Sequence, residues 1–261
     1  MTSILATSIL ATPILADKIC RVPKPGLLVS ARSIVESKLI VSSGVGWLDL
    51  KEPSLGSIGR PSLELISSIF ELGIPKTVQV SVAGGELVSW TEDLDDLLAA
   101  KLPRRSYLKL ALADCRGTDW QKIAERISRA LVRRSQLILV HYADTENSRS
   151  PHWQEVIETT KSLSGRFVLI DTHCKKSGGL LEHYSLEQLE KMIGSAKHLK
   201  LGVALAGSLK LDQLLSLSNL QADWLGVRGA VCQETQRTGD LCSDRLQQAV
   251  ALFPAYSSIG S

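Results

Sequence analysis

Short apolar segments with the character of β-strands recur along the chain, and mixed or polar segments separate them. The usual interval is roughly 30 residues, the length of one strand with its crossover helix. The pattern predicts eight strands, at Leu27–Ser30, Gly46–Lys51, Thr77–Ala83, Tyr107–Leu112, Leu137–Asp144, Phe167–Thr172, Leu201–Ser208 and Trp224–Val231.

Amphipathic segments with the 3.6-residue period of a helix lie between these strands. Ser185 and Gln188 form a capping-box pattern at the start of one segment. Ser150 and Pro151 are the expected cap and first residue of another. The first segment, rich in Val and Ser, is the weakest helix former. The pattern predicts helices at Ser33–Ser43, Ser62–Leu72, Thr91–Ala100, Trp120–Val132, Pro151–Leu163, Ser185–Ile193, Lys210–Leu220 and Ser243–Leu252.

Strict alternation of strand and helix predicts a fold of the α/β class, a (β/α)8 TIM barrel forming a single domain over residues 26–261. A doubly wound open sheet is the alternative, but no G-x-G-x-x-G motif follows the first strand. Residues 1–25 contain the near-repeat SILAT-SILAT-PILA. We expect a poorly ordered extension there. A cleaved signal peptide is less consistent with this segment, since it lacks a basic start and is interrupted by Thr and Pro.

Composition narrows the classes of function. Apolar residues make up 44% of the chain and charged residues 22%, which excludes disorder throughout its length. The net charge of +3 comes without a long basic run, so no nucleic-acid partner is expected. No apolar stretch is long enough to cross a membrane. Five widely spaced cysteines predict neither a disulfide framework nor a zinc site, and a cytoplasmic location fits them. The sequence leaves open whether the chain forms a homo-oligomer.

The predicted strands place unusual charges inside the barrel. Because side chains alternate along a strand, Leu108, Leu110 and Leu112 share the face that packs on helices, and Lys109 points inward. Active sites of this architecture lie at the carboxyl ends of the strands. Charged residues expected to face the interior or to lie just beyond a strand end are Asp49, Lys51, Lys109, Asp171, Lys175 and Arg228.

Charges held inside a barrel must be paired or functional, because desolvating them costs several kcal/mol. Inward salt bridges are one interpretation, strongest for Asp49. The other is amine chemistry, in which a lysine near other cations loses affinity for its proton. The positive charges near each lysine would lower its proton affinity, and they would come from Lys51, Lys109 and Lys175, with a contribution from Arg228. A neutral amine attacks a carbonyl to form a Schiff base or removes a neighbouring proton, and Asp171 would orient a lysine or carry protons.

Glycine-bearing segments follow the last two predicted strands, where this fold commonly binds phosphate through backbone N–H groups. They read Leu205-Ala-Gly-Ser-Leu-Lys210 and Gly226-Val-Arg-Gly-Ala230. A phosphorylated small molecule is therefore the expected substrate, although glycines at 207 and 229 would also suit tight turns. The residues expected to bind substrate or phosphate are Asp49, Gly207, Ser208, Arg228 and Gly229.

Taken together, these segments resemble the (5-formylfuran-3-yl)methyl phosphate synthase family of methanofuran biosynthesis. The resemblance extends in order from about Gly26 to Ala251. It is carried by Leu27-Leu-Val-Ser30, Asp49-Leu-Lys-Glu-Pro53, Gly56-Ser-Ile-Gly59, Tyr107-Leu-Lys-Leu110, Tyr142-Ala-Asp144, Leu169-Ile-Asp-Thr172 with Lys175, Ala204-Leu-Ala-Gly-Ser-Leu-Lys210, Gly226-Val-Arg-Gly-Ala-Val-Cys232, Arg237, Gly239 and Asp244. The segments 83–86 and 145–148 depart from the family pattern.

The resemblance implies a TIM-barrel lyase that joins two molecules of glyceraldehyde 3-phosphate and releases phosphate and water. It implies a Schiff base on Lys51, proton acceptance by Lys109, and further active-site positions at Asp171 and Lys175. It implies neither a metal nor an organic cofactor, and the five histidines show no metal-ligand spacing. Two alternatives remain: a class I aldolase acting on a phosphorylated sugar, and a non-catalytic barrel that binds a phosphorylated metabolite. The charged interior disfavours the second.

Overall fold

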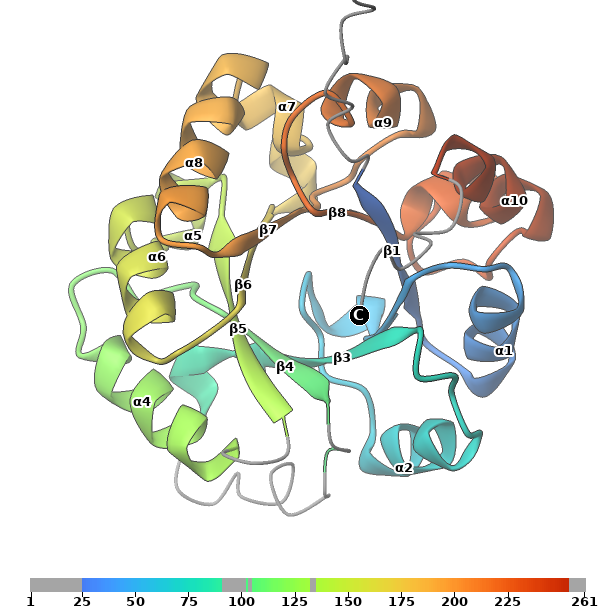
Figure 1. The fold of residues 1–261 in the computed structure, drawn as a ribbon, viewed down its shortest axis with the longest axis horizontal. Helices are drawn as coiled ribbons and strands as arrows, with labels where there is room; N and C mark the ends of the chain where they lie inside the picture. The colour runs from blue at the N-terminus through green and yellow to red at the C-terminus, as the bar shows by residue number, and fades with distance from the viewer. Residues whose placement is uncertain (1–24, 91–101, 103–104, 132–134, 254–261) are drawn as a thin grey trace, which may run out of the picture.

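In the computed structural model, which describes residues 25–90, 102, 105–131 and 135–253, eight parallel strands close into a barrel (Figure 1). Each strand pairs with the next in the chain, and β8 pairs with β1. The closed order confirms the (β/α)8 prediction and excludes the open sheet. The strands are β1 Gly26–Ala31, β2 Trp47–Leu50, β3 Gln79–Glu86, β4 Ser106–Ala111, β5 Ser135–Tyr142, β6 Phe167–Asp171, β7 Gly202–Leu205 and β8 Trp224–Val227.

Helices surround this barrel, with short 3-10 turns at several strand ends. The expected helix at 91–100 and the extension at 1–24 lie outside the described residues. The helices are α1 Ile34–Ser42, α2 Leu63–Glu71, α4 Trp120–Leu131, α5 Thr145–Ser148, α6 Trp153–Ser162, α7 Leu180–His183, α8 Leu186–His198, α9 Leu211–Leu217 and α10 Ser243–Leu252. The 3-10 turns are η1 Pro53–Leu55, η2 Leu87–Ser89, η4 Lys175–Ser177, η5 Gly229–Val231 and η6 Gln233–Thr235.

Capping patterns in the sequence predict several helix starts correctly and one incorrectly. The capping box of Ser185 and Gln188 opens α8 as predicted. The expected start of α6 at Ser150 and Pro151 is wrong, because the helix begins at Trp153 with His152 as its N-cap. Ser150 is buried at the end of β5, where its hydroxyl accepts the Tyr142 N–H at 3.4 Å. That contact holds Ser150 outside the helix.

Two further elements differ from the sequence patterns. The weak segment predicted for α1 forms a regular helix, since Ser33 caps the Glu36 N–H and Ile40 is fully buried. The third strand continues beyond Ala83 to Glu86, through an irregular register against β4. The predicted strand ends at Ala83, but the backbone pairing of β3 with β4 continues to Glu86.

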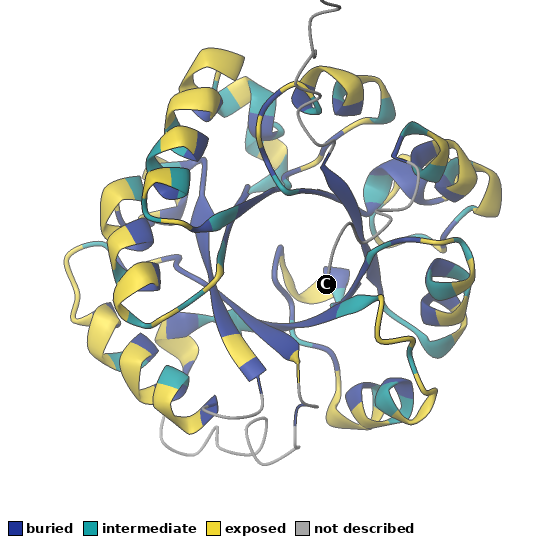
Figure 2. Cartoon of the chain, viewed as in Figure 1, coloured by how far each residue is buried: buried dark blue, intermediate teal, exposed yellow. Residues whose placement is uncertain are grey.

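The main hydrophobic core lies between the barrel and the helices. Outward strand residues such as Leu48, Leu50 and Leu108 pack against buried helix residues such as Ile66 and Ile127. In Figure 2 the strands are largely buried, and most helices show a buried inner face and an exposed outer face. This core confirms the predicted outward face of β2 and β4.

The barrel interior has an aromatic floor. One ring comes from near the beginning of each even-numbered strand, and the ring centroids lie 5.0–5.7 Å apart. TIM barrels fill their interiors with such layers, each supplied by alternate strands. The floor residues are Trp47, Tyr107, Phe167 and Trp224. They close the amino-terminal end of the barrel, so any interior space must open at the carboxyl ends of the strands.

No helix within the described ranges combines the length and apolar character needed to cross a membrane.

Candidate active site

The charged residues occupy the two layers above the aromatic floor. Inward positions repeat every two residues along a strand. The next positions on the even-numbered strands are therefore Asp49, Lys109, Leu169 and Gly226, and beyond them come Lys51, Ala111, Asp171 and Arg228. This stacking brings side chains from four distant segments to the same end of the barrel.

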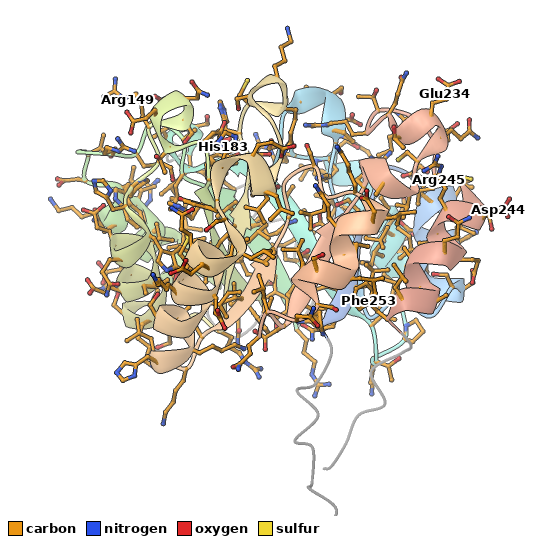
Figure 3. The ribbon with its side chains drawn as sticks, turned by 90° about the horizontal axis from the view of Figure 1, so that it is seen from above. Arg149, His183, Glu234, Asp244, Arg245 and Phe253 are labelled. Carbon is orange, nitrogen blue, oxygen red and sulfur yellow. The ribbon has the colours of Figure 1, made fainter. Side chains whose placement is uncertain are left out.

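A cavity of about 580 Å³ opens above these layers. Figure 3 shows Arg149, His183 and Glu234, each following a barrel strand, along one edge of the molecule, and Arg245 below that edge on α10. The nine site residues expected from the sequence all line the cavity, as do Arg237 and Arg245. The tertiary structure thus brings the lysine cluster and both glycine-bearing segments to one site.

Asp49 and Lys109 form a buried ion pair. The Lys109 Nζ lies 2.6 Å from Asp49 Oδ1, and both side chains are at most 3% exposed. Ser81 and Ser30 also donate to the carboxylate, at 2.7 and 2.9 Å. Burial alone would raise the pKa of Asp49, but the charges of Lys109 and Lys51 hold it below its ordinary value. This ion pair is the alternative interpretation that the sequence allowed for Asp49.

Lys51 is the least constrained of the three lysines. Within the described part of the chain its Nζ makes one hydrogen bond, a long 3.4 Å contact to the Ser57 carbonyl. Burial lowers the pKa of its amine to about 8, and the charges of Lys109 and Lys175 act in the same direction. Asp171 and Asp49 oppose that shift. Lys51 therefore has the properties of an amine that is neutral in a useful fraction near pH 7.

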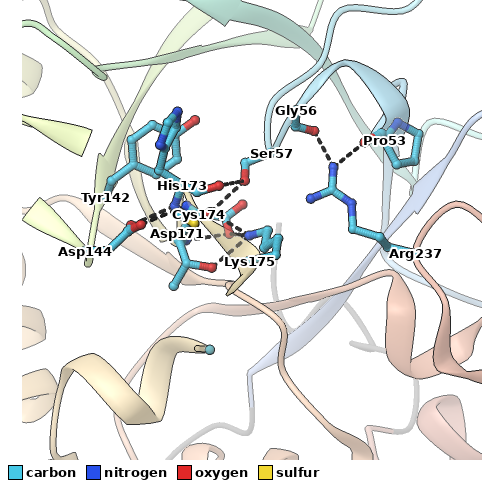
Figure 4. Close-up of polar contacts among 12 residues, drawn as sticks. Pro53, Gly56, Ser57, Tyr142, Asp144, Asp171, His173, Cys174, Lys175 and Arg237 are labelled. Atoms are coloured by element: carbon cyan, nitrogen blue, oxygen red, sulfur yellow. Dashed lines mark hydrogen bonds and ion pairs between the residues drawn. The ribbon is translucent and has the colours of Figure 1, made fainter. Parts of the chain in front are cut away.

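Lys175 is fully engaged beside Asp171 (Figure 4). Its Nζ donates to Asp171 Oδ1 at 2.8 Å and to the carbonyl and hydroxyl oxygens of Thr172 at 2.6 and 2.8 Å. Burial would raise the pKa of Asp171, but Lys175 and Lys51 lower it below its usual value. Asp171 is thus held as a carboxylate between two lysines.

Adduct formation on Lys51 should depend on pH. At limiting aldehyde, the rate should rise about tenfold per pH unit well below pH 8 and level off above it, since only the neutral amine attacks. The measurement is the rate of borohydride-trapped adduct between pH 6 and 9.5. A rate that still rises about tenfold per pH unit between pH 8.5 and 9.5 would show that the pKa of Lys51 is not lowered.

The segments after β7 and β8 form a backbone cradle. The N–H groups of Gly207 and Ser208 have no hydrogen-bond partner in the described part of the chain, and Gly229 begins η5, where the first N–H groups are free. Gly207 has φ +108°, and a Cβ there would meet the Thr172 N at 3.1 Å. A glycine is needed at 207, and its position fits the phosphate binding expected from the sequence.

Arg228 holds the loop after β8 and has no donor left for a phosphate in this conformation. Its guanidinium bonds both carboxylate oxygens of Glu36, at 2.9 and 3.2 Å. Its remaining N–H groups go to the carbonyls of Ser30, Arg237 and Gly239, at 2.6–3.0 Å. All five N–H groups of an arginine are then used. Arg228 lines the cavity, and its contact with phosphate stays a prediction that would need a rearrangement of these hydrogen bonds.

We expect Glu36→Gln to destabilise the protein by about 3 kcal/mol, because it leaves the Arg228 charge buried without a counter-ion. Urea unfolding measures the effect. The matched control is Glu187→Gln, which removes an exposed ion pair with Lys191 and should change stability by less than about 0.5 kcal/mol. Equal stability of the two variants would contradict the importance assigned to the buried pair.

Three residues shape the mouth of the site although the sequence patterns gave them no role. The Ser57 hydroxyl donates to the Thr172 carbonyl at 2.6 Å and joins the loops after β2 and β6. Asp144 accepts the backbone N–H groups of His173 and Cys174, both at 2.7 Å. Arg237 donates to carbonyls of the β2 loop (Figure 4). Ser57, Asp144 and Arg237 all lie in segments that carried the family resemblance, which was the available signal.

Glu86 and Tyr142 form a partly buried contact that sequence reasoning missed. Tyr142 donates its hydroxyl to Glu86 at 2.7 Å, and the Ala113 N–H donates to the same carboxyl at 2.9 Å. Burial raises the pKa of Glu86. Glu86 reaches this position because β3 extends beyond its predicted end. Among the described residues, no group of three or more His, Cys, Asp or Glu side chains could hold a metal ion.

Comparison with known proteins places this chain in a family. A family model described as 4-HFC-P synthase matches residues 27–250. A (5-formylfuran-3-yl)methyl phosphate synthase from Methanobrevibacter smithii is 28% identical over 212 residues, covering 79% of this chain and 89% of the relative. One from Methanopyrus kandleri is 28% identical over 236 residues, covering 87% of this chain and 98% of the relative.

Solved structures show the same fold at low sequence identity. A 3-hexulose-6-phosphate synthase from Salmonella typhimurium has a TM-score of 0.60 and 14% identity, covering 87% of this chain and 99% of that one. A phosphoribosyl anthranilate isomerase from Thermotoga maritima has a TM-score of 0.57 and 14% identity, covering 87% of this chain and 97% of that one. At this identity the likeness extends to the barrel architecture.

Proposed function

Since the chain belongs to the 4-HFC-P synthase family, we propose that it joins two molecules of glyceraldehyde 3-phosphate into (5-formylfuran-3-yl)methyl phosphate. The reaction is that of a carbon–oxygen lyase, and it releases one phosphate and water. Its product serves the biosynthesis of methanofuran. A Schiff base on a lysine carries the chemistry, so that this chain's own side chains supply the nucleophile, the base and the phosphate contacts.

Lys51 is the proposed nucleophile. A pKa of about 8 raises the neutral fraction of the amine at pH 7 from roughly 1 in 2,500, for an ordinary lysine, to roughly 1 in 10. The amine attacks the aldehyde carbon, and loss of water gives an imine. The protonated imine then draws electrons from the neighbouring carbon and makes its hydrogen acidic.

Lys109 is the proposed proton acceptor, and Asp49 is its positioning residue. The buried carboxylate fixes the Lys109 amine within hydrogen-bond reach, with Ser30 and Ser81 filling the remaining acceptor positions of Asp49. General-base catalysis requires such a fixed direction before the pKa matters. We infer that Asp49 acts on the substrate through Lys109 rather than by direct contact.

We propose that Asp171 and Lys175 donate and accept protons on the side of Lys51 away from Lys109. Asp171 influences the charge state of Lys51, and Lys175 holds Asp171 as a carboxylate. The backbone cradle of Gly207, Ser208 and Gly229 would bind the phosphate of one substrate molecule.

One observation carries the proposal. Three lysines and two carboxylates lie together above the aromatic floor, and Lys51, whose pKa is lowered to about 8, is also the lysine with the weakest hydrogen bonding. A purely structural set of salt bridges would leave no such amine facing the cavity.

The direct test mixes the purified protein with glyceraldehyde 3-phosphate alone and follows furan absorbance and free phosphate together. We expect both to rise, with one phosphate per furan. Consumption without absorbance or phosphate would indicate a class I aldolase. Binding without consumption would indicate a barrel that only holds a phosphorylated metabolite. Either result would overturn the proposed reaction.

A further inference from the structure

Arg237 is an anchored guanidinium at the mouth of the cavity that the roles above do not use. It lies on the loop after β8, where its carbonyl accepts the Arg228 Nε–H at 2.6 Å. Its side chain crosses to the β2 side, where one terminal nitrogen donates to the carbonyls of Pro53 and Gly56. Both ends of the residue are therefore fixed before any ligand binds.

The anchor places Arg237 close to Lys51. The Arg237 guanidinium bonds the Gly56 carbonyl, and the Lys51 amine contacts the carbonyl of the next residue, Ser57. The two side chains therefore contact adjacent residues of the loop after β2, and both line the same cavity. A triose bound as an imine on Lys51 would carry its phosphate into that cavity.

Arg237 also has donors to spare. Its Nε and its other terminal nitrogen make no hydrogen bond within the described part of the chain, and that nitrogen points toward the Lys175 side of the site in Figure 4. Apart from Lys51, three deeply placed cations of the cavity are engaged, since Lys109 pairs with Asp49, Lys175 with Asp171 and Arg228 with Glu36. A half-buried guanidinium with free N–H groups beside a cavity can donate charge-assisted hydrogen bonds to a phosphate through its Nε and its second terminal nitrogen.

We propose that Arg237 forms a second phosphate subsite, separate from the backbone cradle, which binds the phosphate of the triose held on Lys51. This inference rests on the proposed function, in which one of two phosphates must be expelled. The phosphate on the carbon two bonds from the imine carbon is placed to leave, and Arg237 stabilises the charge that develops on it.

The elimination of phosphate from the imine uses only side chains of this cavity to take up the proton and the leaving group. The Lys109 amine first passes a proton to Asp49, with which it is paired. The neutral amine then takes the hydrogen of the carbon next to the protonated imine on Lys51 as a proton. The electron pair of that C–H bond then forms a carbon–carbon double bond toward the next carbon, whose C–O bond to phosphate breaks. Phosphate leaves with the electron pair of that C–O bond and is held by Arg237, and the unsaturated imine remains on Lys51. No oxidant, reductant or further reactant is required.

The test compares borohydride trapping on Lys51 with two aldehydes, glyceraldehyde 3-phosphate and unphosphorylated glyceraldehyde, in the wild type and Arg237→Met. We expect the variant to lose its preference for the phosphorylated aldehyde by on the order of 10- to 100-fold, with little change in trapping of glyceraldehyde. Arg237→Lys, which keeps the charge but not the several fixed donors of the guanidinium, should lie between the two. Arg129→Met, on the outer face of α4, is the matched control and should keep the wild-type ratio.

The ratio of trapping with glyceraldehyde 3-phosphate to trapping with glyceraldehyde distinguishes phosphate binding by Arg237 from a purely structural effect. If Arg237 only holds the β2 loop, Arg237→Met will trap both aldehydes less and leave the ratio unchanged, which overturns the proposal. An unchanged ratio with normal trapping would place this phosphate in the backbone cradle and also overturn it. Failure of the proposed function is distinguishable, because the wild type itself would then form no furan.

Discussion

Lys51→Met should lose furan formation by at least roughly a thousandfold, the scale on which removal of a covalent nucleophile acts. The borohydride-trapped adduct should disappear with it, since the neighbouring amines of Lys109 and Lys175 are held in ion pairs with Asp49 and Asp171. The measurement is furan absorbance, with mass analysis of the trapped protein. Retention of activity or of the adduct would remove Lys51 from its proposed role.

The matched control is Lys176→Met. Lys176 follows Lys175 in the chain, but its side chain is exposed and it does not line the cavity. It should keep full activity. Loss of activity in both variants would point to a general effect of lowered positive charge rather than to the chemistry of one amine.

The same substitution should not weaken the fold. The folded protein binds the Lys51 proton less tightly than the unfolded chain does, with a pKa of about 8 against 10.5. Lys51 therefore lowers stability below pH 8, and its contribution becomes more favourable as the pH rises from 8 to 10.5. Lys51→Met should then unfold at no lower urea concentration than the wild type at pH 7.

Lys109→Met is the second large effect, and it should act on both activity and stability. Loss of the proton acceptor should slow furan formation by about 10²–10⁴-fold, while the adduct on Lys51 still forms. Removing one member of the buried pair leaves Asp49 as an uncompensated charge, which should cost about 3–5 kcal/mol. The measurements are furan absorbance, borohydride trapping and urea unfolding.

A double variant separates the two effects. In Asp49→Asn with Lys109→Met, neither charge remains, so most of the lost stability should return while furan formation stays slow. Recovery of activity together with stability would show that Lys109 matters to the fold alone. A single variant that no longer forms the adduct would show that Lys109 is required before proton transfer.

The aromatic floor and the charged layers show which features of the barrel interior the sequence can predict. Alternation along β4 alone was sufficient to place Tyr107 and Lys109 inside and Leu108 outside. The pattern could not show that Trp47, Tyr107 and two further rings meet, because they come from strands far apart in the chain. Nor could it show that β3 continues to Glu86, since its last residues are held by pairing with β4 rather than by their own preference.

The sequence by itself determined the (β/α)8 order, the inward face of β4 and the lysines that face the cavity. These follow from periods of two and 3.6 residues, which are local properties of the chain. Only the tertiary structure decided the partner of each charge. The pairing of Arg228 with Glu36 joins residues 192 positions apart. It uses the donors expected to bind phosphate and leaves Arg237 with free ones. Contacts of that kind depend on how the barrel closes, and no local pattern encodes them.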